Sequence, residues 1–174
     1  MQCVAEMAKQ SEQVLNALDL LTEQHSYLDH LFEQVERAGT RRAAFVELAD
    51  NLAAHAAIEE KIFYPRVMSE QTSDLLHESV EEHLAIKRVL ADLLTMDLDS
   101  DEFMAKLSVL KEEVSHHAHE EEEEKLFPML RKAMDADQLA GLGNELLAMF
   151  ESIIGTSPRK KVPGETRAAA PLPA

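Results

Sequence analysis

The chain has 174 residues and a formal net charge of −16, and hydrophobic residues make up 45% of it while aromatic residues make up only 5%. This length is sufficient for one domain with a substantial hydrophobic core. The strong negative charge argues against nucleic acid or an anionic membrane surface as the main partner, because either would require a basic face.

Five helical segments are predicted in chain order from apolar residues spaced three and four apart. They cover about residues 12–37, 41–68, 73–94, 100–134 and 135–154. Short connections favour antiparallel neighbours, so residues 12–134 are predicted to form an all-α, up-down-up-down four-helix bundle. Residues 135–154 add a short C-terminal helix, which Asp135 and Gln138 would cap. A flexible N-terminus over residues 1–11 and a disordered, Pro- and Ala-rich tail over residues 155–174 complete the prediction.

The sequence also bears on the cellular location of the protein. Cys3 is the only cysteine, which excludes a disulfide within one chain. The N-terminal stretch lacks the apolar segment of a secretory signal, and no apolar run approaches the roughly 18 residues that a membrane helix needs. We therefore expect a cytoplasmic protein without a membrane partner, and the oligomeric state stays open.

One pattern of ligand-type residues occurs twice along the chain. A single histidine on one helix is followed, on the next helix, by a histidine and a glutamate four residues apart. Because residues at i and i+4 project from the same helix face, each pair presents an imidazole and a carboxylate to one point. The six residues are His25, His55 and Glu59 in the first half and His83, His117 and Glu121 in the second.

These six residues fall on the apolar seams of their helices, so they are predicted to be buried. Burying ionised carboxylates without partners would consume much of a small domain's stability, which is about 5–15 kcal/mol. Bound cations would compensate the charge, and imidazole with carboxylate suits iron better than structural zinc, with manganese as the second choice. If Glu59 and Glu121 bridge two ions, an oxo or hydroxo bridge would leave about one open position on each.

At this point the chain resembles the hemerythrin-like proteins with an HHE cation-binding domain, over about residues 15–131. The resemblance implies a four-helix bundle around an oxo-bridged di-iron centre. It also implies that the iron ligands are His25, His55, Glu59, His83, His117 and Glu121. The matching segments are the helices of His25 and His83, residues 55–60 with Phe63-Tyr64-Pro65, and His116-His117 with Glu121 and Phe127-Pro128.

The chain departs from the family pattern at two places. Oxygen-carrying hemerythrins have a second histidine where this chain has Lys87, which argues against reversible oxygen carriage. In addition, Glu59 lies six residues before a proline, whereas Glu121 lies seven before the corresponding one. Glu122 therefore competes with Glu121 as the ligand, and Glu121 is preferred because it stays on the apolar seam of its helix.

Three functions remain as hypotheses. The first is a non-haem di-iron protein, with two iron ions, that binds, senses or scavenges a small ligand such as oxygen, nitric oxide or hydrogen peroxide. The second is a di-iron peroxidase or catalase-like enzyme, although no residue is singled out as catalytic. The third is a helical adaptor whose core histidines need no metal.

Overall fold

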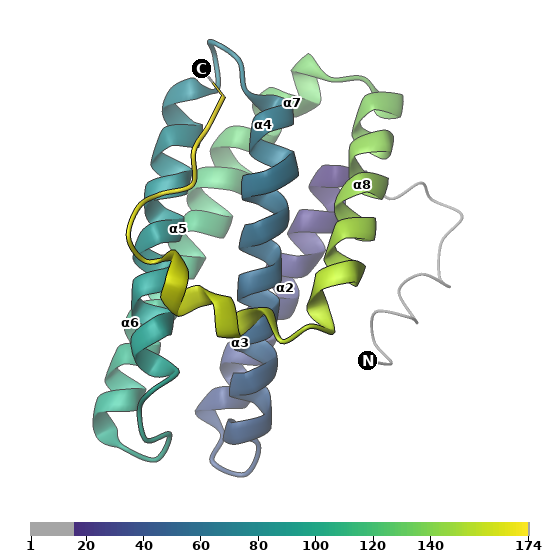
Figure 1. The fold of residues 1–174 in the computed structure, drawn as a ribbon. Helices are drawn as coiled ribbons and strands as arrows, with labels where there is room; N and C mark the ends of the chain where they lie inside the picture. Colours follow the sequence, from purple (N-terminus) through teal and green to yellow (C-terminus); the bar gives the residue numbers. More distant parts are fainter. Residues whose placement is uncertain (1–15, 174) are drawn as a thin grey trace.

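The computed structural model describes residues 16–173, and every regular element in that range is helical (Figure 1). There are four long helical stretches: α2 (Ala17–Glu36); α3 (Arg41–Ile58) with η1 (Glu59–Phe63) and α4 (Tyr64–Val67); α5 (Ser73–Leu93); and α6 (Asp101–Ser115) with η2 (His116–Leu126) and α7 (Phe127–Ala133). Next come α8 (Ala136–Ile154) and the short 3₁₀-helix η3 (Pro158–Glu165). The prediction of an all-α protein is confirmed, while the predicted flexible residues 1–11 lie outside the described residues.

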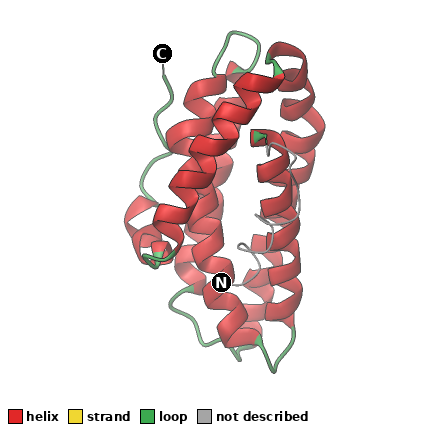
Figure 2. Ribbon diagram, turned by 90° about the vertical axis from the view of Figure 1, so that its right-hand side faces the viewer, coloured by secondary structure: helices red, strands yellow, loops and turns green. Residues whose placement is uncertain are grey.

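The long stretches lie side by side, as two perpendicular views show (Figures 1 and 2). α2 packs chiefly against α3, α5 packs against α6, and α8 lies along α2 and α3. The predicted cap of α8 is present, because Asp135 accepts a hydrogen bond from the backbone of Gln138 and its own backbone donates to the Gln138 side chain. None of the described helices is long and apolar enough to cross a membrane.

A layer of buried polar residues divides the hydrophobic core. On α2, Leu21 belongs to one apolar cluster and Leu28 to a second, and the buried His25 lies between them. His83 on α5 separates the same two clusters. Apolar side chains therefore close the polar layer above and below, which shields it from bulk water along the helix axes.

The segment after α8 differs from the predicted disordered tail. It passes across α3 and α5 as η3, drawn in yellow in Figure 1. Val162 is buried in the core, Arg159 pairs with Asp50 of α3, and Glu165 lies 3.2 Å from Lys87 of α5. The prediction of disorder rested on composition. Composition does not reveal these few anchoring contacts, because they join residues that are distant in the sequence.

Candidate metal centre

The first half of the polar layer joins α2, α3, η1 and η2. One ligand atom each from His25, His55, Glu59 and Glu122 lies within 4.8 Å of the others. His55 Nε2 is 3.2 Å from Glu59 Oε1, and His25 Nε2 is 3.1 Å from Glu122 Oε2. All four side chains are buried. Helix packing thus gathers two imidazoles and two carboxylates around one point.

The second half of the layer lies directly beside the first. Here Glu59, His83 and His117 bring their ligand atoms together, and the two histidine Nε2 atoms are 2.9 Å apart. Glu59 Oε2 is 3.2 Å from His83 Nε2, and Glu122 Oε1 is 3.8 Å from His117 Nε2. Both carboxylates therefore extend one oxygen toward each half, so the two groups form a single site.

The buried atoms of this site lack ordinary hydrogen-bond partners. Six buried side-chain nitrogen and oxygen atoms among the described residues have no hydrogen bond, and five of them belong to the layer. Orphaned polar atoms in a core are costly unless another group, such as a cation, occupies the space between them. The donor set therefore fits metal ions. The five atoms are His25 Nε2, His55 Nε2, Glu59 Oε1 and Oε2, and Glu122 Oε2.

The opposite ring nitrogen of every histidine in the layer has a hydrogen-bond partner. A carboxylate or amide oxygen at each Nδ1 favours the proton there, which leaves the Nε2 lone pair directed at the centre. The pairs are His25–Glu123 at 2.7 Å, His55–Gln24 at 2.7 Å, His83–Glu60 at 3.1 Å and His117–Glu82 at 2.6 Å.

Contacts between the buried histidines and glutamates shift the pKa values of both in the metal-free fold. Burial by itself would lower the pKa of His25, but the adjacent carboxylates of Glu122 and Glu123 raise that pKa to about 10. For His83, burial is likewise outweighed by Glu59 and Glu60, and its pKa rises to about 9. Burial would raise the pKa of Glu59, yet the neighbouring histidines hold it well below its usual value. Without metal, protons on His25 and His83 supply positive charge.

Tyr64 adds a phenol to the layer. Its side chain is fully buried and donates a hydrogen bond of 2.9 Å to Glu122 Oε1. The same hydroxyl lies 3.2 Å from His83 Nε2 and 3.3 Å from His117 Nε2. Burial and the nearby carboxylates raise the pKa of Tyr64 well above 10, so the phenol keeps its proton.

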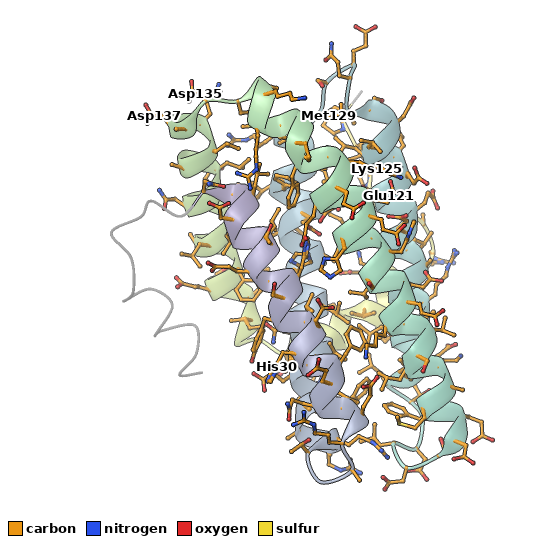
Figure 3. The ribbon with its side chains drawn as sticks, turned by 180° about the vertical axis from the view of Figure 1, so that it is seen from behind. His30, Glu121, Lys125, Met129, Asp135 and Asp137 are labelled. Carbon is orange, nitrogen blue, oxygen red and sulfur yellow. The ribbon has the colours of Figure 1, made fainter. Side chains whose placement is uncertain are left out.

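The second-half carboxylate in the layer is Glu122, and Glu121 lies outside it. Residues 116–126 form a π-helix, in which hydrogen bonds run from i to i+5, so His117 faces Glu122 rather than Glu121. Glu121 instead lies beside Lys125 on the outer side of η2 (Figure 3). With Glu122, the spacing to Pro128 becomes six residues, as in the first half. The preference for Glu121 assumed a regular α-helical period, which the π-helix breaks.

Lys87, which stands where a hemerythrin histidine was expected, supports the site from outside. Its ammonium is 2.9 and 2.8 Å from the two oxygens of Glu60, which in turn contacts His83 Nδ1. Lys87 also pairs with Glu165 beyond α8. The lysine therefore takes part in orienting His83 and links it to the C-terminal segment.

Residues 16–130 match the family model of the hemerythrin HHE cation-binding domain. The chain belongs to this family. Its metal-binding character is therefore a family property, and the clustered histidines and glutamates of this HHE chain are consistent with it.

This HHE chain is also similar to two individual proteins. A crystal structure of a hemerythrin HHE cation-binding domain-containing protein from Mycobacterium kansasii has 25% sequence identity and a TM-score of 0.73, and the match covers 90% of this chain and 97% of that one. A DNA nickase from Nostoc sp. is 26% identical over 145 residues, which is 82% of this chain and 41% of the relative. The chain thus spans about two fifths of that curated relative.

Proposed function

We propose that the protein holds two iron ions in the buried layer, one beside His25 and His55 and the other beside His83 and His117. The observation that carries this proposal is the placement of Glu59, whose Oε1 lies 3.2 Å from His55 Nε2 while its Oε2 lies 3.2 Å from His83 Nε2. One carboxylate thereby serves two adjacent donor groups, and Glu122 does so from the opposite helix. The proposal also takes the four long stretches as an up-and-down bundle of the hemerythrin kind.

The donor set favours iron, because imidazole and carboxylate ligands match its intermediate character, and manganese is the second choice. Bound iron would supply redox chemistry and a Lewis-acid centre for a small oxygen-containing ligand. Four protein donors per ion leave coordination positions free in a six-coordinate arrangement. We therefore propose that the protein binds, senses or scavenges oxygen, nitric oxide or hydrogen peroxide.

The chain's own residues would serve this function in three ways. The flanking apolar clusters exclude water, and the carboxylates and amide at the histidine Nδ1 atoms fix the rings. Tyr64 keeps a proton on a buried hydroxyl in the second half, where it donates to Glu122. A small ligand would therefore meet a buried site that is shielded from water and has the Tyr64 hydroxyl beside it.

Anaerobic loading with ferrous iron tests the proposal directly. Metal analysis should give about two iron ions per chain, and exposure to oxygen should produce the absorption bands of an oxo-bridged pair. Fewer than one iron per chain after complete reconstitution would rule the proposal out. A metal-free chain that unfolds at the same temperature as the loaded chain would instead support the helical adaptor.

A catalase-like or peroxidase activity is the second candidate, and the buried phenol of Tyr64 favours it because its hydroxyl lies beside the two histidines of the second half, His83 and His117. Sustained oxygen evolution from hydrogen peroxide, lost in His55→Ala, would support this enzyme. Bleaching of the iron without turnover would reject it.

A nicking activity is not proposed for this chain. The Nostoc relative carries the name DNA nickase, but this chain spans only 41% of it. The net charge of −16 also opposes binding to a polyanion.

A further inference from the structure

A second group of metal-ligand side chains lies outside the buried layer, where α5 meets η2. Glu82, His116 and Glu121 each offer one ligand atom, and these atoms lie within 4.8 Å of one another. His116 Nε2 is 3.4 Å from Glu82 Oε1 and 3.5 Å from Glu121 Oε1. One imidazole and two carboxylates thus meet at a point that belongs to neither half of the buried layer.

Glu121 is the member of this group that the metal-free fold leaves unsatisfied. Its side chain is only 5% exposed, and its Oε2 has no hydrogen-bond partner. The other oxygen is 2.5 Å from Lys125, which follows it on the outer side of η2 (Figure 3). Lys125 is more than half exposed, so it only partly balances the negative charge of Glu121, and it leaves Oε2 without a partner. Glu121 thus brings into the group a buried carboxylate with one oxygen unpartnered, which a cation would stabilise.

The two side chains around Glu121 are already oriented for a cation. His116 Nδ1 lies 3.1 Å from Glu120 Oε2, which favours the proton on Nδ1 and leaves the Nε2 lone pair facing the group. Glu82 uses Oε2 to accept a hydrogen bond of 2.6 Å from His117 Nδ1. Its Oε1 therefore remains available for an ion.

The π-helix creates this arrangement. The i to i+5 register that pairs His117 with Glu122 inside also pairs His116 with Glu121 on the adjacent face. At the corresponding places of the first half, one residue before His55 and Glu59, the chain has Ala54 and Ile58. The outer group is thus a feature of the second half alone.

The surroundings of the group favour cations. An open groove of about 520 Å³ runs beside it, and its acidic lining includes Glu78, Glu81, Glu112 and Glu113. His116 is 47% exposed at the edge of this groove, so an ion can arrive from solvent. Clefts lined by charge of one sign raise the local concentration of counter-ions.

We propose that Glu82, His116 and Glu121 form a second, solvent-accessible site for a divalent first-row metal ion, separate from the buried pair. An imidazole with two carboxylates is a borderline-to-hard donor set that such ions accept, and water would complete the coordination. Glu82 connects the two sites, since one of its oxygens faces the outer group and the other holds His117. The outer site would accept an ion whether or not iron occupies the buried layer.

Zinc is a suitable probe because it undergoes no redox chemistry. The full-length chain is first treated with ferrous iron under anaerobic conditions, weakly bound iron is removed by gel filtration, and the iron that remains is measured. It is then titrated with Zn²⁺ by calorimetry, with metal analysis after gel filtration. The wild type should bind one more Zn²⁺ ion per chain than His116→Ala, and Glu121→Gln should bind that ion at least tenfold more weakly, as expected on losing a ligand.

Glu113→Gln is the matched control, because it removes one charge from the same groove without touching the group, and it should retain the additional ion. The exposed position of His116 makes its alanine variant compatible with folding, which thermal unfolding verifies. If iron does not enter the buried layer, the Zn²⁺ difference between wild type and His116→Ala still reports the outer site. The proposal is overturned if that difference is zero, or if Glu121→Gln binds Zn²⁺ like Glu113→Gln.

Discussion

The register of η2 gives a sharp prediction, which a matched pair of substitutions tests. Glu122→Gln replaces the carboxylate that lies 3.1 Å from His25 Nε2 and 3.8 Å from His117 Nε2. Glu121→Gln makes the same chemical change one residue earlier, outside the buried layer. An amide keeps the shape of the side chain but loses its negative charge and one of its two oxygens. We expect only Glu122→Gln to impair the buried metal site.

The magnitude follows from the position of Glu122 between both halves of the layer. Loss of a residue that merely supports a ligand costs about 10–100-fold in metal affinity. Loss of a carboxylate that serves both ions should therefore exceed about 100-fold, or ~3 kcal/mol. Metal at 100 times its Kd stabilises a fold by about 2.7 kcal/mol. For a chain of this length that corresponds to a rise in Tm of about 5–10 °C.

The assay measures iron content and Tm for each variant, with and without ferrous iron. Wild type and Glu121→Gln should load about two ions in the buried layer and show the full rise in Tm. Glu122→Gln should retain at most one ion and lose most of the rise. If Glu121→Gln loses the iron while Glu122→Gln retains it, the assignment based on the π-helix is wrong.

Three further predictions concern the proton balance, the buried phenol and the C-terminal segment. The folded pKa values of His25 and His83, about 10 and about 9, exceed the ordinary 6.5. The contribution of these two histidines to metal-free stability should therefore be complete below pH 6.5 and fall as pH rises through 9–10. Metal loading at pH 7 should displace these protons, and an indicator dye in weak buffer would detect them. Tyr64→Phe removes the donor to a buried carboxylate, so urea unfolding of the metal-free chain should show a loss of about 1.5–3 kcal/mol, and an unchanged midpoint would contradict the hydrogen bond. Val162→Ala should lower the free energy of unfolding by about 1–2 kcal/mol while the exposed Lys161→Ala leaves it unchanged, and equal stabilities would mean that the segment does not pack.

The sequence by itself determined the helical class and most of the candidate site. Apolar residues spaced three and four apart predicted the helices, because that period follows from the geometry of the α-helix. The same period placed His25, His55, Glu59, His83 and His117 on buried seams, and the structure brings these five side chains together. This part was predictable because each residue's direction depends on its own helix alone.

Only the tertiary structure decided the remaining features. The choice of Glu122 depends on a π-helix, whose i to i+5 bonds shift the register by one residue in a way that no local pattern in the Glu120–Glu124 run reveals. The C-terminal segment is held at two residues. Arg159 binds Asp50, more than a hundred residues earlier in the sequence, and Val162 packs into a core built by other helices. The outer Glu82–His116–Glu121 group likewise joins two helices. Contacts between distant segments depend on how helices pack, and composition and periodicity carry no information about that packing.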